Sequence, residues 1–184
     1  MPAPRHACES RSRVFFALMP PASVAAEIGE LAQSLGLTGQ AVSTDRLHLT
    51  LAFIGNVDDM QIDTLLARGD AAQMPAFALA LDHVGGFAHA GINWLAPSEP
   101  PQALPALSRM LYKNTHSAID GRRFRPHITI ERKAAVLETR SITPIRWPVT
   151  DFSLIASGVN GAPGAYRELR RWPLLPASVE AFRL

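Results

Sequence analysis

The chain has 184 residues, of which 47% are hydrophobic and 18% charged, and its formal net charge is +2. This length suits one domain with a buried core, and no apolar stretch reaches the roughly 20 residues of a membrane-spanning helix. Residues 1–13 lack the apolar centre of a secretory signal. We therefore expect a flexible tail over residues 1–12, one globular domain over residues 13–184 and no membrane association. The single cysteine, Cys8, favours a cytoplasmic location.

The apolar pattern predicts seven strands and three helices in mixed order. The first helix is indicated by apolar residues at Val24, Ile28, Leu31 and Leu35, which repeat every three or four positions. The second follows the capping pair Asp58 and Gln61. Strands are predicted at 13–19, 46–54, 77–81, 92–95, 122–132, 149–156 and 164–169, and helices at 21–35, from 58 onward and at 101–119.

Glycine pairs and turn residues are expected to separate these elements, with Gly55-Asn56 and Gly85-Gly86 ending two of the strands. Several strands follow one another without an intervening helix. Such neighbours favour antiparallel sheets with helices packed on one side, which is an α+β fold.

One short pattern occurs twice in the chain. His48-Leu49-Thr50-Leu51 returns as His127-Ile128-Thr129-Ile130, about half the chain later. Because alternate residues of a strand point to the same face, each copy presents a histidine and a threonine together, with apolar residues behind them. Two imidazoles in one cleft can supply a general base and a general acid at neutral pH. A lone copy would more simply be a surface pair or a buried, hydrogen-bonded histidine.

Positive charge is concentrated near the second copy. Residues 1–92 carry a net charge of −4, and residues 93–184 carry +6. Sixteen of the eighteen cationic side chains are arginine, whose planar guanidinium suits phosphate. The cluster consists of Arg122, Arg123, Arg125, Arg132 and Lys133. It indicates either an anion site or a solvated arginine-rich surface, and the neighbouring His-x-Thr strand favours the anion site.

The stretches HLTLAFIG and HITIER resemble the two signatures of the two-histidine (2H) phosphoesterases. With RVFFALMPP near the start and FSLIASGVNGAPGAYRELRRWPL near the end, the chain is most similar to the bacterial RNA 2′,3′-cyclic phosphodiesterases, also called LigT-like 2′-5′ RNA ligases. This resemblance implies a bilobal fold in which two antiparallel sheets face each other across a central groove, with the helices on the outside.

The resemblance also implies a function. The substrate would be an RNA 3′ end that bears a 2′,3′-cyclic phosphate, tRNA fragments included, opened to a 2′-phosphate by a monomeric enzyme without metal or cofactor. By analogy His48 would donate a proton and His127 accept one. Thr50, Thr129 and Arg132 would bind the phosphate. Two alternatives stay open: the same fold acting on a small cyclic nucleotide or a 2′-5′ linkage, and a non-catalytic module that binds RNA ends.

Strand parity complicates the second motif. It places Glu131 on the face of His127 and Arg132 on the opposite face, unless the strand ends or bulges there.

Other residues offer weaker candidates for a site. His83 shares the parity of the apolar residues before it and is predicted to be a satisfied histidine near the core. Phe53, Tyr166 and Trp172 could each stack on a base or pack in the core. No zinc, P-loop or dinucleotide pattern is present.

Overall fold

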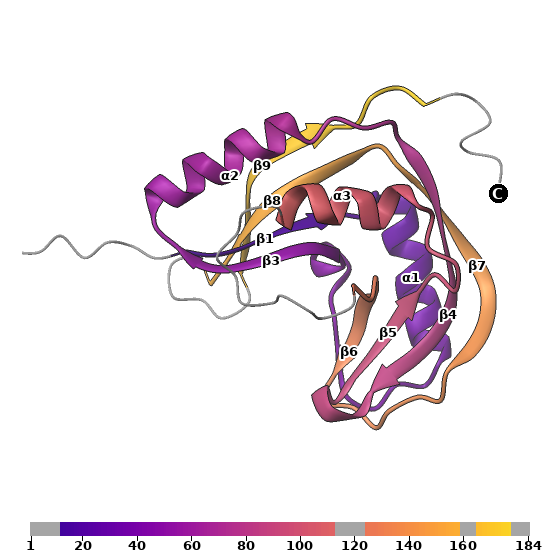
Figure 1. The fold of residues 1–184 in the computed structure, drawn as a ribbon. Helices are drawn as coiled ribbons and strands as arrows, with labels where there is room; N and C mark the ends of the chain where they lie inside the picture. The colour runs from indigo at the N-terminus through magenta and orange to yellow at the C-terminus, as the bar shows by residue number, and fades with distance from the viewer. Residues whose placement is uncertain (1–11, 113–123, 159–164, 178–184) are drawn as a thin grey trace, which may run out of the picture.

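The computed structural model describes residues 12–112, 124–158 and 165–177. Residues 1–11, the end of the third predicted helix and residues 122–123 of the second motif strand lie outside this part. Ser12, placed in the tail by the sequence, is the first residue of a strand. The elements, shown in Figure 1, are β1 (Ser12–Leu18), α1 (Ala22–Ser34), β2 (Gln40–Ala41), β3 (Leu49–Val57), α2 (Asp59–Ala71), β4 (Phe77–Phe87), β5 (Ile92–Ala96), α3 (Ala103–Tyr112), β6 (Ile128–Arg132), β7 (Arg140–Val149), β8 (Asp151–Ser157) and β9 (Tyr166–Pro173).

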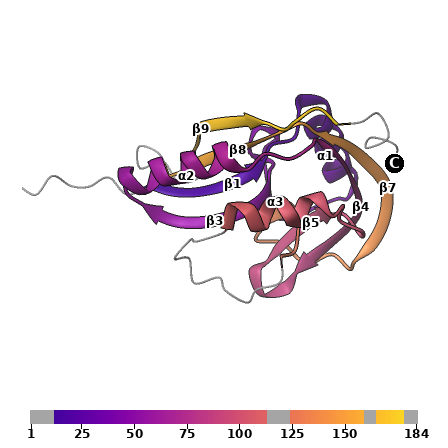
Figure 2. The ribbon, with the colours of Figure 1, turned by 45° about the horizontal axis from the view of Figure 1, so that its top comes forward.

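The nine strands described form one antiparallel network in the order β7-β4-β5-β6-β3-β1-β8-β9, with β2 paired to β6. The predicted α+β class is confirmed. The halves β7-β4-β5-β6 and β3-β1-β8-β9 meet where β3 and β6 pair through one residue pair, Leu49 and Ile128. Figure 2 shows the two halves as separate groups of strands. The two predicted sheets are therefore connected at a narrow seam.

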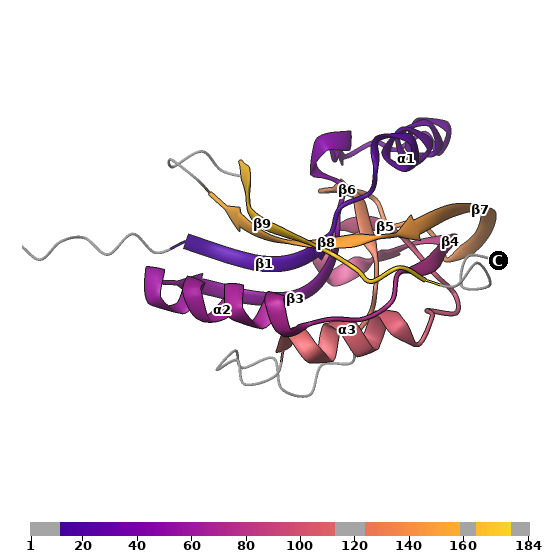
Figure 3. The same ribbon diagram turned by 90° about the horizontal axis from the view of Figure 1, so that it is seen from above.

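The helices lie on both sides of the strands. Figure 3 shows α1 on one side and α2 and α3 on the other. Helix α1 packs against β7, α2 against β9 and α3 against β3. Their apolar faces join a core that includes Phe16, Ile28, Leu107 and Phe152, all buried. Among the described residues, no helix is long and apolar enough to cross a membrane.

Local sequence signals explain where α2 begins and where α1 ends. The side chain of Asp58 accepts a hydrogen bond from the backbone N–H of Gln61 at 2.8 Å, and the side chain of Gln61 accepts one from Asp58 at 3.0 Å. This is the predicted capping box. At the end of α1, Gly36 adopts the left-handed conformation with φ of 61°, which stops the helix at little steric cost.

Several strand boundaries differ from prediction. The motif strands are shorter at their start, because a 3₁₀ turn at Thr44–Arg46 precedes β3 and β6 begins at Ile128. The predicted glycine breaks are wrong: Gly55 lies within β3, and Gly85-Gly86 lies within β4. A side chain at Gly85 would collide with the ring of Trp94 on β5, so this glycine permits close packing rather than a turn.

Strand β7 was not predicted from the sequence. Its residues include Pro144 and Pro148, which lack the N–H needed for a full ladder. The structure accommodates them because β7 is an edge strand that pairs only with β4. The predicted strand 149–156 is divided accordingly, with Val149 ending β7 and Asp151 starting β8.

Candidate active site at the seam of the sheet

The two His-x-Thr motifs meet at the seam between the halves of the sheet. Leu49 and Ile128, which pair there, directly follow His48 and His127 and are fully buried. The antiparallel direction of the strands brings the histidine of each motif toward the threonine of the other. Because neighbouring residues point to opposite faces, both histidines and both threonines lie on the face away from the core.

Each histidine is held by the same hydrogen bond to its own chain. Nδ1 of His48 lies 2.8 Å from the carbonyl oxygen of Arg46, and Nδ1 of His127 lies 2.7 Å from that of Arg125. A carbonyl oxygen can only accept, so Nδ1 carries a proton in both rings. Nε2 is therefore the nitrogen left to exchange a proton with a ligand.

A phenylalanine supports each imidazole. Ring centroids lie 5.0 Å apart for Phe15 and His48, and 5.2 Å apart for Phe87 and His127. Neither motif predicts these supports, since they come from β1 and β4. The carbonyl acceptors, by contrast, occupy the same position in both motifs. Each motif has an arginine two residues before the histidine, in RLHLT and RPHIT, and these arginines supply the two carbonyls.

The pKa of each histidine is lowered from its ordinary value. Burial is the largest cause for both, opposed by the backbone hydrogen bond on Nδ1. The positive charge of Arg132 lowers the pKa of both rings further. His48 is also affected by His127 and Arg46. A lowered pKa keeps an imidazole neutral near pH 7, which suits a general base.

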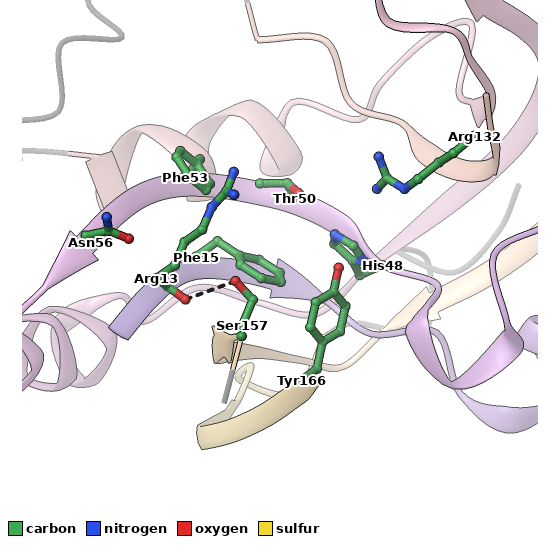
Figure 4. A pocket seen from close by; sticks show the side chains of 10 residues that line it. Arg13, Phe15, His48, Thr50, Phe53, Asn56, Arg132, Ser157 and Tyr166 are labelled. Atoms are coloured by element: carbon green, nitrogen blue, oxygen red, sulfur yellow. Dashed lines mark hydrogen bonds between the residues drawn. The ribbon is translucent and has the colours of Figure 1, made fainter. Parts of the chain in front are cut away.

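A bulge in β6 turns Arg132 toward the histidines. The pairing of β5 with β6 skips Ile130, which has no partner on β5. The extra residue changes the parity of the strand, so Ile130 and Glu131 are both buried and Arg132 points to the catalytic face. Figure 4 shows Arg132 directed at the same opening as His48. The bulge that the sequence left open is therefore present.

The predicted position of Glu131 on the catalytic face is wrong. Its carboxylate is only 1% exposed and accepts hydrogen bonds from the backbone N–H of Gly39 and, at 2.6 Å, from the side chain of Asn93. Asn93 also donates to the carbonyl of Ala135 at 2.9 Å and accepts from Leu137 N–H at 2.9 Å. This buried network connects β5, β6 and the chain before β2, and it supports the bulge that positions Arg132.

Glu131→Ala should lower the free energy of unfolding by about 2–4 kcal/mol, because it leaves the Gly39 N–H and the Asn93 amide buried without an acceptor. Chemical denaturation followed by tryptophan fluorescence measures this change. Glu138→Ala, at an exposed position beyond the same strand, is the matched control and should change stability little. Equal stability of the two variants would show that the network contributes nothing.

A cavity of about 610 Å³ opens beside His48. Figure 4 shows that its walls come from β1, β3, β8, β9 and the end of β6. The ring of Tyr166 stands edge-on to His48, with centroids 5.4 Å apart. The lining residues are Arg13, Phe15, His48, Thr50, Phe53, Asn56, Arg132, Ser157, Gly158 and Tyr166.

The three aromatic candidates for base stacking lie in two different places, the cavity and the core. Phe53 and Tyr166 line the cavity. Trp172 is 6% exposed and stacks on Phe152 with centroids 5.2 Å apart, so it packs in the core. His83, as predicted, is satisfied elsewhere: Nδ1 lies 3.0 Å from Asp82 and Nε2 lies 3.1 Å from Ser141. In the described part of the chain, no three His, Cys, Asp or Glu side chains gather as a metal site.

Comparison with known proteins identifies the family. Residues 20–161 match the family model described as the 2′-5′ RNA ligase superfamily. This chain belongs to that superfamily. The RNA 2′,3′-cyclic phosphodiesterase of Escherichia coli K12 is 33% identical over 171 residues, which cover 88% of this chain and 96% of the relative.

Solved structures agree with this membership of the 2′-5′ RNA ligase superfamily. E. coli LigT in its apo form has a TM-score of 0.78 and 33% identity, covering 89% of this chain and 98% of its own. LigT with 3′-AMP has a TM-score of 0.79 and 32% identity, covering 90% and 99%. The predicted family is confirmed, and the chain is an enzyme of the phosphodiesterase type.

Proposed function

We propose that this protein hydrolyses the 2′,3′-cyclic phosphate at RNA 3′ ends, tRNA fragments among them, to a 2′-phosphate. The observation that carries the proposal is the matched pair of imidazoles, each with Nδ1 bound to its own chain and Nε2 left for a ligand. His48 lines a cavity whose wall also includes the cationic side chains of Arg13 and Arg132. The name of the E. coli relative and the capture of 3′-AMP by LigT support the same substrate class.

The reaction needs one base and one acid. Water attacks phosphorus and loses a proton to Nε2 of a neutral imidazole, while the bond to the ribose O3′ breaks and that oxygen takes a proton from Nε2–H of an imidazolium. The product carries a 2′-phosphate and a 3′-hydroxyl, so atoms and protons balance. In-line displacement requires the two imidazoles on opposite sides of phosphorus, which two motifs from opposite halves of the sheet can provide.

The resemblance to the 2H family assigns His127 as base and His48 as acid. Charge does not favour His127 as the base, because Arg132 lowers the pKa of both rings, and His127 and Arg46 lower the pKa of His48 further. The threonine hydroxyls and the Arg132 guanidinium meet the charge on the non-bridging oxygens.

The direct test is to incubate the purified protein with an oligonucleotide that ends in a 2′,3′-cyclic phosphate, in excess EDTA, and to identify the product by ³¹P NMR. We expect a 2′-phosphomonoester. A 3′-phosphomonoester would contradict the proposed leaving group. Activity that chelation abolishes and a divalent metal restores would replace acid–base catalysis by the histidines with a metal mechanism.

The pH dependence of kcat/KM should be bell-shaped, with both limbs displaced below the ordinary histidine pKa of about 6.5. Both limbs move to lower pH because the pKa of both rings is lowered. The base becomes active at lower pH, and the acid loses its proton at lower pH. A bound phosphate anion raises both values, so the profile of kcat should lie at higher pH than that of kcat/KM. Coincident profiles centred above the ordinary histidine pKa would contradict this arrangement.

Thr50→Val and Thr129→Val should each lower kcat/KM about tenfold, because each removes a hydroxyl that donates to an anionic oxygen while keeping the β-branched shape. Melting temperature and pH optimum should change little. Thr143→Val, at an exposed position of β7, is the control. Unchanged kinetics in both motif variants would mean that the hydroxyls serve only the strands.

A further inference from the structure

The cavity extends well beyond the catalytic end. Thr50, Phe53 and Asn56 of β3 all line it, three residues apart rather than two. The pairing of β3 with β1 explains this spacing, because Leu51 and Ile54 have no partner on β1 and each bulge shifts the parity once. Six residue steps at about 3.3 Å each give this wall a length of at most about 20 Å. That is longer than a single nucleotide needs.

The far end of the cavity carries its own positive charge. Arg13 is exposed on β1, and its guanidinium lies 4.8 Å from the ring centroid of Phe53. Figure 4 shows the guanidinium between Phe53 and Thr50, with Asn56 on the other side of Phe53. The Ser157 hydroxyl donates a hydrogen bond to the Arg13 carbonyl at 3.2 Å. Within the described residues, none of the ion pairs includes Arg13. No carboxylate lines the cavity either.

The cavity thus has two cationic ends and an aromatic middle. Arg132 and His48 lie at one end, the Arg13 guanidinium lies toward the other, and Phe15, Phe53 and Tyr166 line the same cavity. An RNA 3′ terminus has the same alternation, because a nucleoside separates the cyclic phosphate from the preceding phosphodiester. A cyclic mononucleotide lacks that second anion.

We propose that Arg13, assisted by the Asn56 amide, binds the phosphodiester on the 5′ side of the terminal nucleotide and so selects RNA over cyclic mononucleotides. This inference rests on the proposed function, which fixes the cyclic phosphate at the histidines. The guanidinium is well suited to the task because it can donate two parallel hydrogen bonds to a phosphodiester.

The kinetic test compares a dinucleotide that ends in a 2′,3′-cyclic phosphate with the corresponding 2′,3′-cyclic mononucleotide. Arg13→Met keeps an unbranched side chain and removes the charge. It should lower kcat/KM for the dinucleotide about tenfold and leave the mononucleotide unchanged. Arg146→Met, on the exposed face of the edge strand β7, should affect neither substrate.

A second substrate isolates the phosphate itself. In a dinucleotide whose internal linkage is a neutral methylphosphonate, Arg13 has no anion to bind. Wild type and Arg13→Met should then hydrolyse it equally, so that the loss seen with the phosphodiester depends on both partners. Equal losses on mononucleotide and dinucleotide, or no loss on either, would overturn the proposal.

A binding measurement keeps this inference separate from the proposed activity. The affinity of the dinucleotide 2′-phosphate is measured by calorimetry at several salt concentrations. Arg13→Met should weaken binding about tenfold and reduce the slope of log K against log salt by about 0.7, the contribution of one single-strand phosphate contact. If the wild type hydrolyses neither cyclic compound, the proposed function fails, and this slope still decides whether Arg13 binds phosphate; an unchanged slope rejects it.

Discussion

Replacing either motif histidine by alanine should lower kcat/KM by about 10²–10⁴-fold, the usual contribution of a general acid or base. The structure gives each ring one nitrogen for the reaction, because Nδ1 is bound to the carbonyl of Arg46 or Arg125. His83 cannot take their place, since its ring is bound to Asp82 and Ser141 away from the seam. Initial rates on a cyclic-phosphate oligonucleotide measure the loss.

The double variant His48→Ala/His127→Ala should be little worse than either single variant, because an acid and a base that act in one step lose their joint effect once. His83→Ala removes a histidine that is hydrogen-bonded to Asp82 and Ser141 outside the site and should keep wild-type rates. Melting temperatures establish that the variants fold. Strictly multiplicative losses would show that the two imidazoles act in separate steps.

The catalytic pair could be found in the sequence because its signal is local and repeated. An alternating strand places residues of the same parity on one face whatever its neighbours are. Two matching His-x-Thr segments therefore predicted two imidazoles backed by apolar residues, and the structure brings them to one seam. The helices were predictable for a similar reason, since the Asp58 capping box depends on residues three positions apart.

The rest of the site depends on pairing between distant strands. The bulge at Ile130 exists because β5 and β6 pair with one residue in excess, and no local pattern reveals it. The sequence left a bulge open as an alternative, and strand parity without the bulge reverses the positions of Glu131 and Arg132. The aromatic supports Phe15 and Phe87 come from strands that neither motif identifies.

Strand β7 could not be predicted from the sequence for a similar reason, because its position at the edge of the sheet depends on distant strands. The sequence shows prolines where a central strand could not carry them, and only the sheet order shows that this strand lies at an edge. Likewise, Gly85 signals a break in sequence and a close approach of Trp94 in space.

Arg132→Met should lower kcat/KM by about 10²–10³-fold, as removal of a preorganised charge stabiliser typically does. A second effect of Arg132→Met, on the pH profile, distinguishes Arg132 from a residue that only contacts the substrate. Because the Arg132 charge lowers the pKa of both histidines, its removal should move both limbs of the pH profile to higher pH. Arg132→Lys should restore the position of the limbs more than the rate, since an ammonium keeps the charge but not the bidentate geometry.

The control for Arg132 is Arg140→Met, at the exposed start of β7 and absent from the cavity lining, which should change neither rate nor profile. A tenfold or smaller loss with unmoved limbs would place the Arg132 guanidinium outside the transition state. A large loss with displaced limbs would show that one side chain, turned inward by a single extra residue in β6, both stabilises the phosphate and helps to lower the pKa of the two histidines.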